Sequence, residues 1–86
     1  MNGSLKFPDA DQQTRVVEAL RDVRIGTHVE IQNSTTGIRW FGDVTKFSSE
    51  ALEVEPERVS RWPSPLLIVR ATGKTPGGAF IITRVL

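Results

Sequence analysis

The hydrophobic pattern is clearest in residues 25–55, where strand and turn signals follow one another without a gap. Apolar and polar residues alternate in residues 29–32, which is the period-2 pattern of a half-buried strand. Residues 33–37, rich in Asn, Ser, Thr and Gly, form a turn by composition. A second alternating run follows, and a third lies between the turn residues 48–50 and Pro56, which lacks an amide donor and ends the strand. The pattern therefore predicts a three-stranded antiparallel meander.

The middle strand of this meander is expected to bend. Its apolar residues first share one face and then, at Lys46 and Phe47, switch to the other face. Such a switch within a continuous strand requires a bulge or a sharp bend, and Gly42 is the predicted kink because it lacks a Cβ. Trp40 shares its face with other apolar residues, which favours burial in the core over a surface contact with a nucleic-acid base, although both positions remain open. The residues on this first face are Ile38, Trp40, Gly42 and Val44.

A short amphipathic helix is predicted before the meander, over residues 10–23. Asp9 is a favourable N-cap, and Gln12 three residues later completes a capping-box pattern. Asp11 and Arg15 have the i,i+4 spacing of an ion pair on the solvent side. We expect the helix to pack against the sheet or to cover one open end of a barrel. Its apolar stripe consists of Val16, Val17, Leu20 and Val23.

Two further strands are predicted near the C-terminus, separated by a Gly-, Pro- and Thr-rich turn at residues 72–78. Residues 66–69 and 79–82 are apolar on both faces, which is typical of strands buried on two sides. A chain this short seldom covers both faces of two strands, so we expect either the helix or another copy of the chain to cover one. The predicted oligomer interface consists of Leu67, Val69, Phe80 and Ile82.

The length of 86 residues is that of one small domain, which we assign to residues 9–86 after a flexible arm at residues 1–8. The chain contains no cysteine, so packing or oligomerisation must stabilise it without disulfides. The sequence has neither a signal-peptide pattern nor an apolar run near the ~20 residues that span a bilayer. We therefore expect a cytoplasmic protein without a membrane partner.

The residues that catalysis would need are few. His28 is the single histidine and there is no cysteine, so neither a metal site nor a nucleophile–base pair is indicated. The segment from Gly73 to Thr75 resembles the end of a phosphate-binding loop, but Ile68 stands where that loop needs a glycine. We predict a non-enzymatic protein without cofactor or metal.

The charges are unevenly distributed along the chain. The net charge is +1, yet no acidic residue follows Glu57, and the last third contains five basic residues. A basic segment of this kind suits a polyanion, and an aromatic side chain beside it can stack on a nucleic-acid base. Trp62 lies among these charges in a proline-bounded loop. The predicted nucleic-acid-binding residues are Arg58, Arg61, Trp62, Lys74 and Arg84.

The order of one helix, a bent meander and two closing strands is similar to that of Sm-like proteins, a branch of the small SH3-like barrels. The spacing of apolar and glycine residues in the first half resembles the first Sm motif, and the glycine turn and apolar strand of residues 78–85 resemble the second. The resemblance implies a mainly β fold, a five-stranded antiparallel SH3-like or Sm-like barrel with a short N-terminal helix. Ser48 replaces an aspartate of the Sm pattern, so no ligand residue is carried over. The residues that carry the first motif are Val29, Ile31, Gly42, Val44, Phe47, Leu52 and Val54.

Two functions remain open at this point. The first is a non-enzymatic module that binds RNA or single-stranded DNA through the basic last third and Trp62. The alternative is a protein-interaction or assembly module, regulatory or phage-type, that forms a homo-oligomer through its last two strands. The low net charge favours the alternative, because nucleic-acid-binding modules are commonly more basic.

Overall fold

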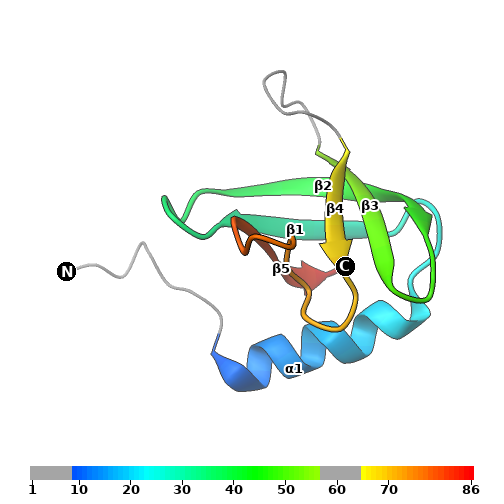
Figure 1. Cartoon of the computed structure of the whole chain (residues 1–86), viewed down its shortest axis with the longest axis horizontal. Coiled ribbons are helices and arrows are strands. Elements are labelled where there is room, and N and C mark those ends of the chain that lie inside the picture. Colours follow the sequence, from blue (N-terminus) through cyan, green and yellow to red (C-terminus); the bar gives the residue numbers. More distant parts are fainter. Residues whose placement is uncertain (1–8, 57–64) are drawn as a thin grey trace.

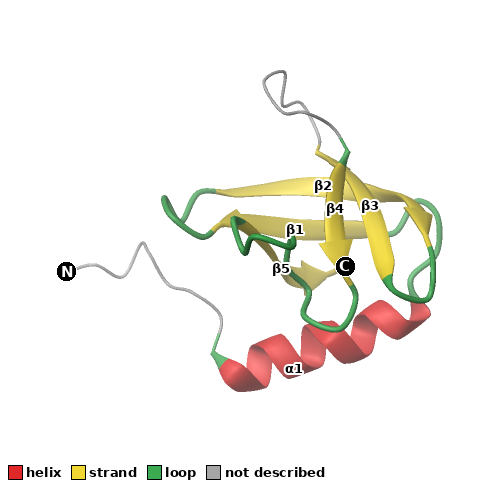
Figure 2. Ribbon diagram, viewed as in Figure 1, coloured by secondary structure: helices red, strands yellow, loops and turns green. Residues whose placement is uncertain are grey.

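The computed structural model describes residues 9–56 and 65–86, which form one N-terminal helix and five antiparallel strands (Figure 2). The sheet has the strand order β4-β3-β2-β1-β5 and curls into a half-barrel (Figure 1). The predicted fold class, mainly β with five antiparallel strands and a short N-terminal helix, is confirmed. The predicted arm at residues 1–8 lies outside the described residues. The strands are β1 (His28–Asn33), β2 (Arg39–Phe47), β3 (Ala51–Pro56), β4 (Leu66–Val69) and β5 (Phe80–Val85).

The helix α1 (Ala10–Ala19) continues into one 3₁₀ turn, η2 (Leu20–Asp22). The predicted N-cap is confirmed, because the Asp9 carboxylate accepts a 2.8 Å hydrogen bond from the amide of Gln12. Val16, Leu20 and Val23 are buried in the core. The helix lies beneath the sheet, along β5 and the connection between β4 and β5 (Figure 1).

The predicted meander is present as β1, β2 and β3, and the predicted bend in β2 is a bulge. The pairing register between β2 and β3 shifts between Val44 and Lys46. Gly42 was the wrong place for the irregularity, since it pairs regularly with Val29 on one side and Pro56 on the other. A Cβ on Gly42 would lie 2.9 Å from the carbonyl oxygen of Glu55, so the glycine is needed for close approach of the backbones.

Burial in β1 differs from the predicted half-buried strand. Glu30 and Gln32 are 8% and 0% exposed, although they lie on the face opposite the apolar residues. Hydrogen bonds compensate part of this burial: Thr83 donates to the Glu30 carboxylate at 2.7 Å, and the Gln32 side-chain amide donates to the carbonyl of Gly37 at 3.1 Å. The polar residues Glu30 and Gln32 of β1 can thus be buried because neighbouring residues form hydrogen bonds with their side chains.

The two closing strands differ in burial. In β4 the prediction of two-sided burial is wrong within the described chain, because Leu66 and Ile68 are buried while Leu67 is 46% exposed. In β5 it is confirmed, since Ile81 and Ile82 are 5% and 1% exposed. Both edges of β5 have neighbours from this chain, whereas β4 pairs along its length only with β3.

The connection between β4 and β5 partly closes the half-barrel. Lys74 forms single antiparallel bridges both to Val69 in β4 and to Ile81 in β5. Gly73 beside it has a φ of +71° and lies against Val16 and Leu20 of the helix. The helix and this connection therefore cover the same end of the core. The core consists of Val16, Leu20, Val23, Val29, Ile31, Val44, Leu52, Val54, Leu66, Ile68 and Ile82.

Candidate functional site

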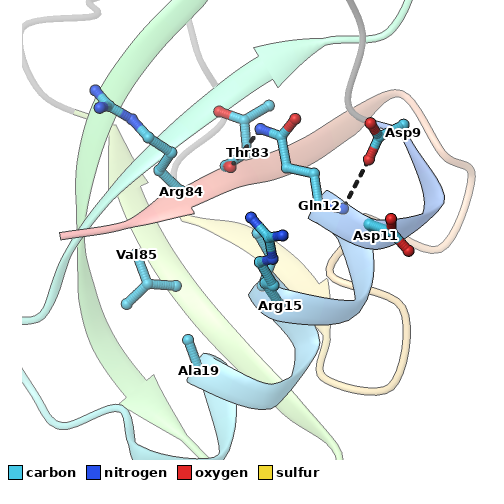
Figure 3. A pocket seen from close by; sticks show the side chains of 9 residues that line it. Asp9, Asp11, Gln12, Arg15, Ala19, Thr83, Arg84 and Val85 are labelled. Atoms are coloured by element: carbon cyan, nitrogen blue, oxygen red, sulfur yellow. Dashed lines mark hydrogen bonds between the residues drawn. The ribbon is translucent and has the colours of Figure 1, made fainter.

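A groove of about 510 Å³ runs between α1 and β5 (Figure 3). Its floor forms where the helix approaches the edge of the sheet: the Gln12 side-chain amide donates to the carbonyl of Thr83 at 3.2 Å, and Val16 anchors the helix in the core. The groove thus exists because Gln12, a polar residue of the helix, forms a hydrogen bond to the edge of β5, while the apolar residues of the helix pack into the core beside it. Its lining residues are Asp9, Asp11, Gln12, Arg15, Val16, Ala19, Thr83, Arg84 and Val85.

Arg84 is held at this groove by a buried carboxylate. The β1–β5 register shifts between Glu30 and Ile31, and Thr83 is the extra residue on β5. The Thr83 hydroxyl binds one oxygen of Glu30, and an Arg84 guanidinium nitrogen lies 3.3 Å from the other. The Arg84 side chain is 56% exposed, so it keeps contact with solvent while one of its donors is engaged.

The two ends of the groove differ in charge. Asp9 and Asp11 lie at the end near the start of the helix, while Arg84 and Val85 lie at the other (Figure 3). Arg15 stands between them on the helical side and is exposed. No Asp11–Arg15 ion pair forms, so that prediction is wrong; among the described residues Arg84 and Glu30 form an ion pair at 3.3 Å, and His28 lies 2.7 Å from the Asp43 carboxylate. The end with Asp9 and Asp11 therefore repels anions, whereas at the other end the charge of Arg84 is partly offset by Glu30.

The structure separates two of the predicted nucleic-acid-binding residues. Arg84 lines the α1–β5 groove, whereas Lys74 lines a second hollow on the opposite flank of α1, together with Arg21 and Glu18. Arg58, Arg61 and Trp62 lie outside the described residues. Arg15 was not among the predicted site residues, although the sequence placed it on the solvent side of the helix. Only the packing of α1 on β5 brings it beside Arg84.

Arg70, which belongs to the basic last third, has a structural position. Its guanidinium donates to the carbonyls of Leu20 at 2.7 Å and Ser48 at 2.6 Å, and its carbon lies 5.8 Å from the centre of the Phe47 ring. It binds the end of the helix, where carbonyl oxygens lack partners, to the β2–β3 turn. We therefore do not count Arg70 among the residues that meet a ligand.

The remaining aromatic residues are partly accommodated within the chain. Trp40 is half-buried and contacts the ring of Phe80 edge-on at 6.1 Å, so it lies between the core and the surface positions that the sequence left open. On the opposite face of the sheet the rings of His28 and Phe41 stack at 5.3 Å, and His28 bonds Asp43 at 2.7 Å. An ordinary cross-strand pairing thus accounts for the single histidine.

The predicted interface residues occupy different environments. Leu67 is exposed, Val69 and Phe80 are half-buried, and Ile82 is 1% exposed within the core of the chain. The side chain of Ile82 therefore serves the interior of this domain. Leu67 is the member of the set whose side chain faces solvent.

Over residues 9–56 and 65–86, the structure has no cluster of three or more His, Cys, Asp or Glu side chains that could hold a metal ion. Within the same residues, no helix has the length and apolar character to span a membrane. Comparisons of the chain with known protein families, curated proteins and solved structures give no match.

Proposed function

We propose that this protein is a non-enzymatic nucleic-acid-binding module whose α1–β5 groove receives the phosphate backbone of RNA or single-stranded DNA. The observation that carries the proposal is the position of Arg15 and Arg84. They come from different elements and rise on the two sides of one groove. Guanidinium groups on both sides can contact one phosphate or two successive phosphates.

The charge gradient along the groove defines how the strand lies. The backbone follows the end with Arg84 and Val85 and avoids the end with Asp9 and Asp11. Few phosphates meet the protein in this arrangement, so binding is weak and depends on salt. Bases that leave the groove would need aromatic partners, and Trp62 stays the predicted stacking residue.

The fold that supports this function is, in our proposal, a small SH3-like barrel of the Sm-like kind. The strand order β4-β3-β2-β1-β5 and the short connection whose Lys74 bridges β4 and β5 support it. The fold alone does not specify a ligand, so the groove carries the functional argument.

The test is fluorescence anisotropy with labelled single-stranded RNA, single-stranded DNA and duplex DNA, titrated with protein at several salt concentrations. We expect single strands to bind and the affinity to fall with salt. Arg15→Gln and Arg84→Gln each remove one phosphate contact, so each lowers the slope of log affinity against log salt by about 0.7.

Matched controls lie on the other flank of the helix. Arg21→Gln and Lys74→Gln remove equal charge from the second hollow and should leave the slope unchanged if the α1–β5 groove is the site. An equal decrease of the slope in all four variants would indicate that the protein binds nucleic acid through its overall positive charge and not through this groove. Absence of binding at low salt would refute the function itself. Arg61→Ala and Trp62→Ala test separately the contacts predicted outside the described residues.

A further inference from the structure

The two outer strands of the sheet have edges of different kinds. The edge of β5 is occupied by the chain itself: Ile82 donates to the carbonyl of Gly73 at 2.8 Å, and Thr75 donates to that of Phe80 at 3.0 Å. The side-chain amide of Gln12 donates a hydrogen bond to the carbonyl of Thr83. Residues 80–83 of β5 therefore have no free edge to which a second chain could add a strand.

The edge of β4 is occupied only at its C-terminal end. Val69 donates to the carbonyl of Lys74 at 2.8 Å and accepts a 2.8 Å bond from the amide of Gly73, both on the side away from β3. The backbone amide of Arg70 points in the opposite direction and donates to the backbone carbonyl of Glu50 at 2.9 Å. Because the backbone amide and carbonyl groups of successive strand residues point to alternate edges, those of Leu67 point to the same edge as those of Val69. Its amide and carbonyl point away from β3, and no described residue bonds them.

The two positions on either side of Leu67 along this edge have no amide donor that needs a partner strand. Pro65 has no amide hydrogen, and both groups of Val69 are satisfied by the connection to β5. Leu67 thus presents one donor and one acceptor that an added strand can bond. Its side chain is 46% exposed and borders a shallow groove of about 270 Å³ that Phe47 and Glu53 also line.

We propose that this edge pairs with a second copy of the same chain, β4 antiparallel to β4, about a two-fold axis at Leu67. In this arrangement the two Leu67 residues exchange both backbone hydrogen bonds, and their side chains lie next to each other on one face of the joined sheet. The contact is restricted to residues 66–68, because Lys74 occupies the edge opposite Val69 and the chain bends at Pro65. The dimer is small and therefore reversible.

Complementarity of the flanking groups selects a second copy over an unrelated peptide. A peptide strand at this edge would place two of its own amides opposite Pro65 and Val69. The amide opposite Pro65 can donate to the proline carbonyl, but the amide opposite Val69 meets a carbonyl that already accepts from Gly73 and stays unbonded. A second copy brings a proline and a residue already bonded within its own chain to those positions. The edge is therefore self-complementary, and no amide donor is left without a partner.

The experiment is analytical ultracentrifugation of the free protein from micromolar to millimolar concentration, without nucleic acid. We expect a reversible monomer–dimer equilibrium. Leu67→Lys places two like charges at the two-fold axis and should leave only monomer. Ile25→Lys and Ile38→Lys, at exposed apolar positions away from this edge, are the matched controls and should dimerise as the unmodified protein does.

A second variant tests the register itself. The chain has no cysteine, so Leu67→Cys introduces a single thiol. Paired residues that exchange backbone bonds have Cα atoms about 5.5 Å apart, within the range of a disulfide. Mild oxidation should give a covalent dimer from Leu67→Cys faster than from Ile38→Cys. Monomer at every concentration, dimerisation unaffected by Leu67→Lys, or closed rings larger than a dimer would each overturn the proposal. Circular dichroism of Leu67→Lys checks that the variant is folded.

Discussion

Gly42 provides the sharpest test of how tightly the sheet is packed. It lies in β2 between β1 and β3, and a Cβ at this position would lie 2.9 Å from the carbonyl oxygen of Glu55 and 2.9 Å from a methyl carbon of Val54. A third atom, the terminal methyl of Ile31, would lie at 3.3 Å. The contact with Glu55 is with backbone, so relief requires β2 and β3 to separate.

The magnitude follows from two opposing terms for Gly42→Ala. Overpacking a core position costs about 1–3 kcal/mol. Alanine also restricts the unfolded chain, which returns about 0.4–1 kcal/mol. Because the strands cannot move apart without losing their pairing, we expect a net loss of about 1–2 kcal/mol. For a domain of this size that loss lowers the melting temperature by roughly 5–15 °C.

The measurement is urea unfolding followed by circular dichroism, with thermal unfolding as a second readout. Gly77→Ala is the matched control, because a Cβ on Gly77 would have no atom within 4 Å and its backbone does not have a positive φ. We expect this control to be as stable as the unmodified protein or slightly more stable. If Gly42→Ala also keeps its urea midpoint, the close approach of β2 and β3 at Gly42 is wrong.

Two further predictions concern the helix. Arg70→Ala removes the donors to Leu20 and Ser48 and should lower the free energy of unfolding by about 1.5–3 kcal/mol; Arg70→Lys should recover little, since one ammonium group does not reproduce the planar fork. The exposed Lys46→Ala is its control, and equal stability of Arg70→Ala and Lys46→Ala in urea would contradict the structural role. Asp9→Ala removes the N-cap and should cost about 0.5–2 kcal/mol, whereas Asp9→Ser should retain most of the stability in the same assay.

Much of the fold was predictable because its signals are local. The cap at Asp9, the apolar stripe of the helix and the alternation in the meander depend on neighbours a few residues apart, and each is present in the structure. The bulge in β2 was also predictable, since a switch of the apolar face requires one. It lies where the apolar face switches, before Lys46, and not at Gly42, because a glycine that bends a strand and a glycine that permits close approach of backbones give the same sequence pattern.

The candidate site was predictable only in part. Arg84 was identified from the charge of the last third, and it lies in the groove. Lys74 was identified by the same reasoning but lies on the other flank of the helix, while Arg15 was not identified at all. Charge along a sequence does not specify which side of a packed helix a residue reaches.

Local patterns in the sequence thus determined which segments become helix and strand. The tertiary structure decided which polar residues are buried and which strand edge stays open. Glu30 is buried because a bulge places Thr83 and Arg84 against its carboxylate, 53 and 54 residues further along the chain. The backbone edge at Leu67 stays open because the connection through Lys74 closes the edge of β5 and only the end of β4. Such outcomes depend on contacts between distant residues, whose partners are known only once the chain has folded.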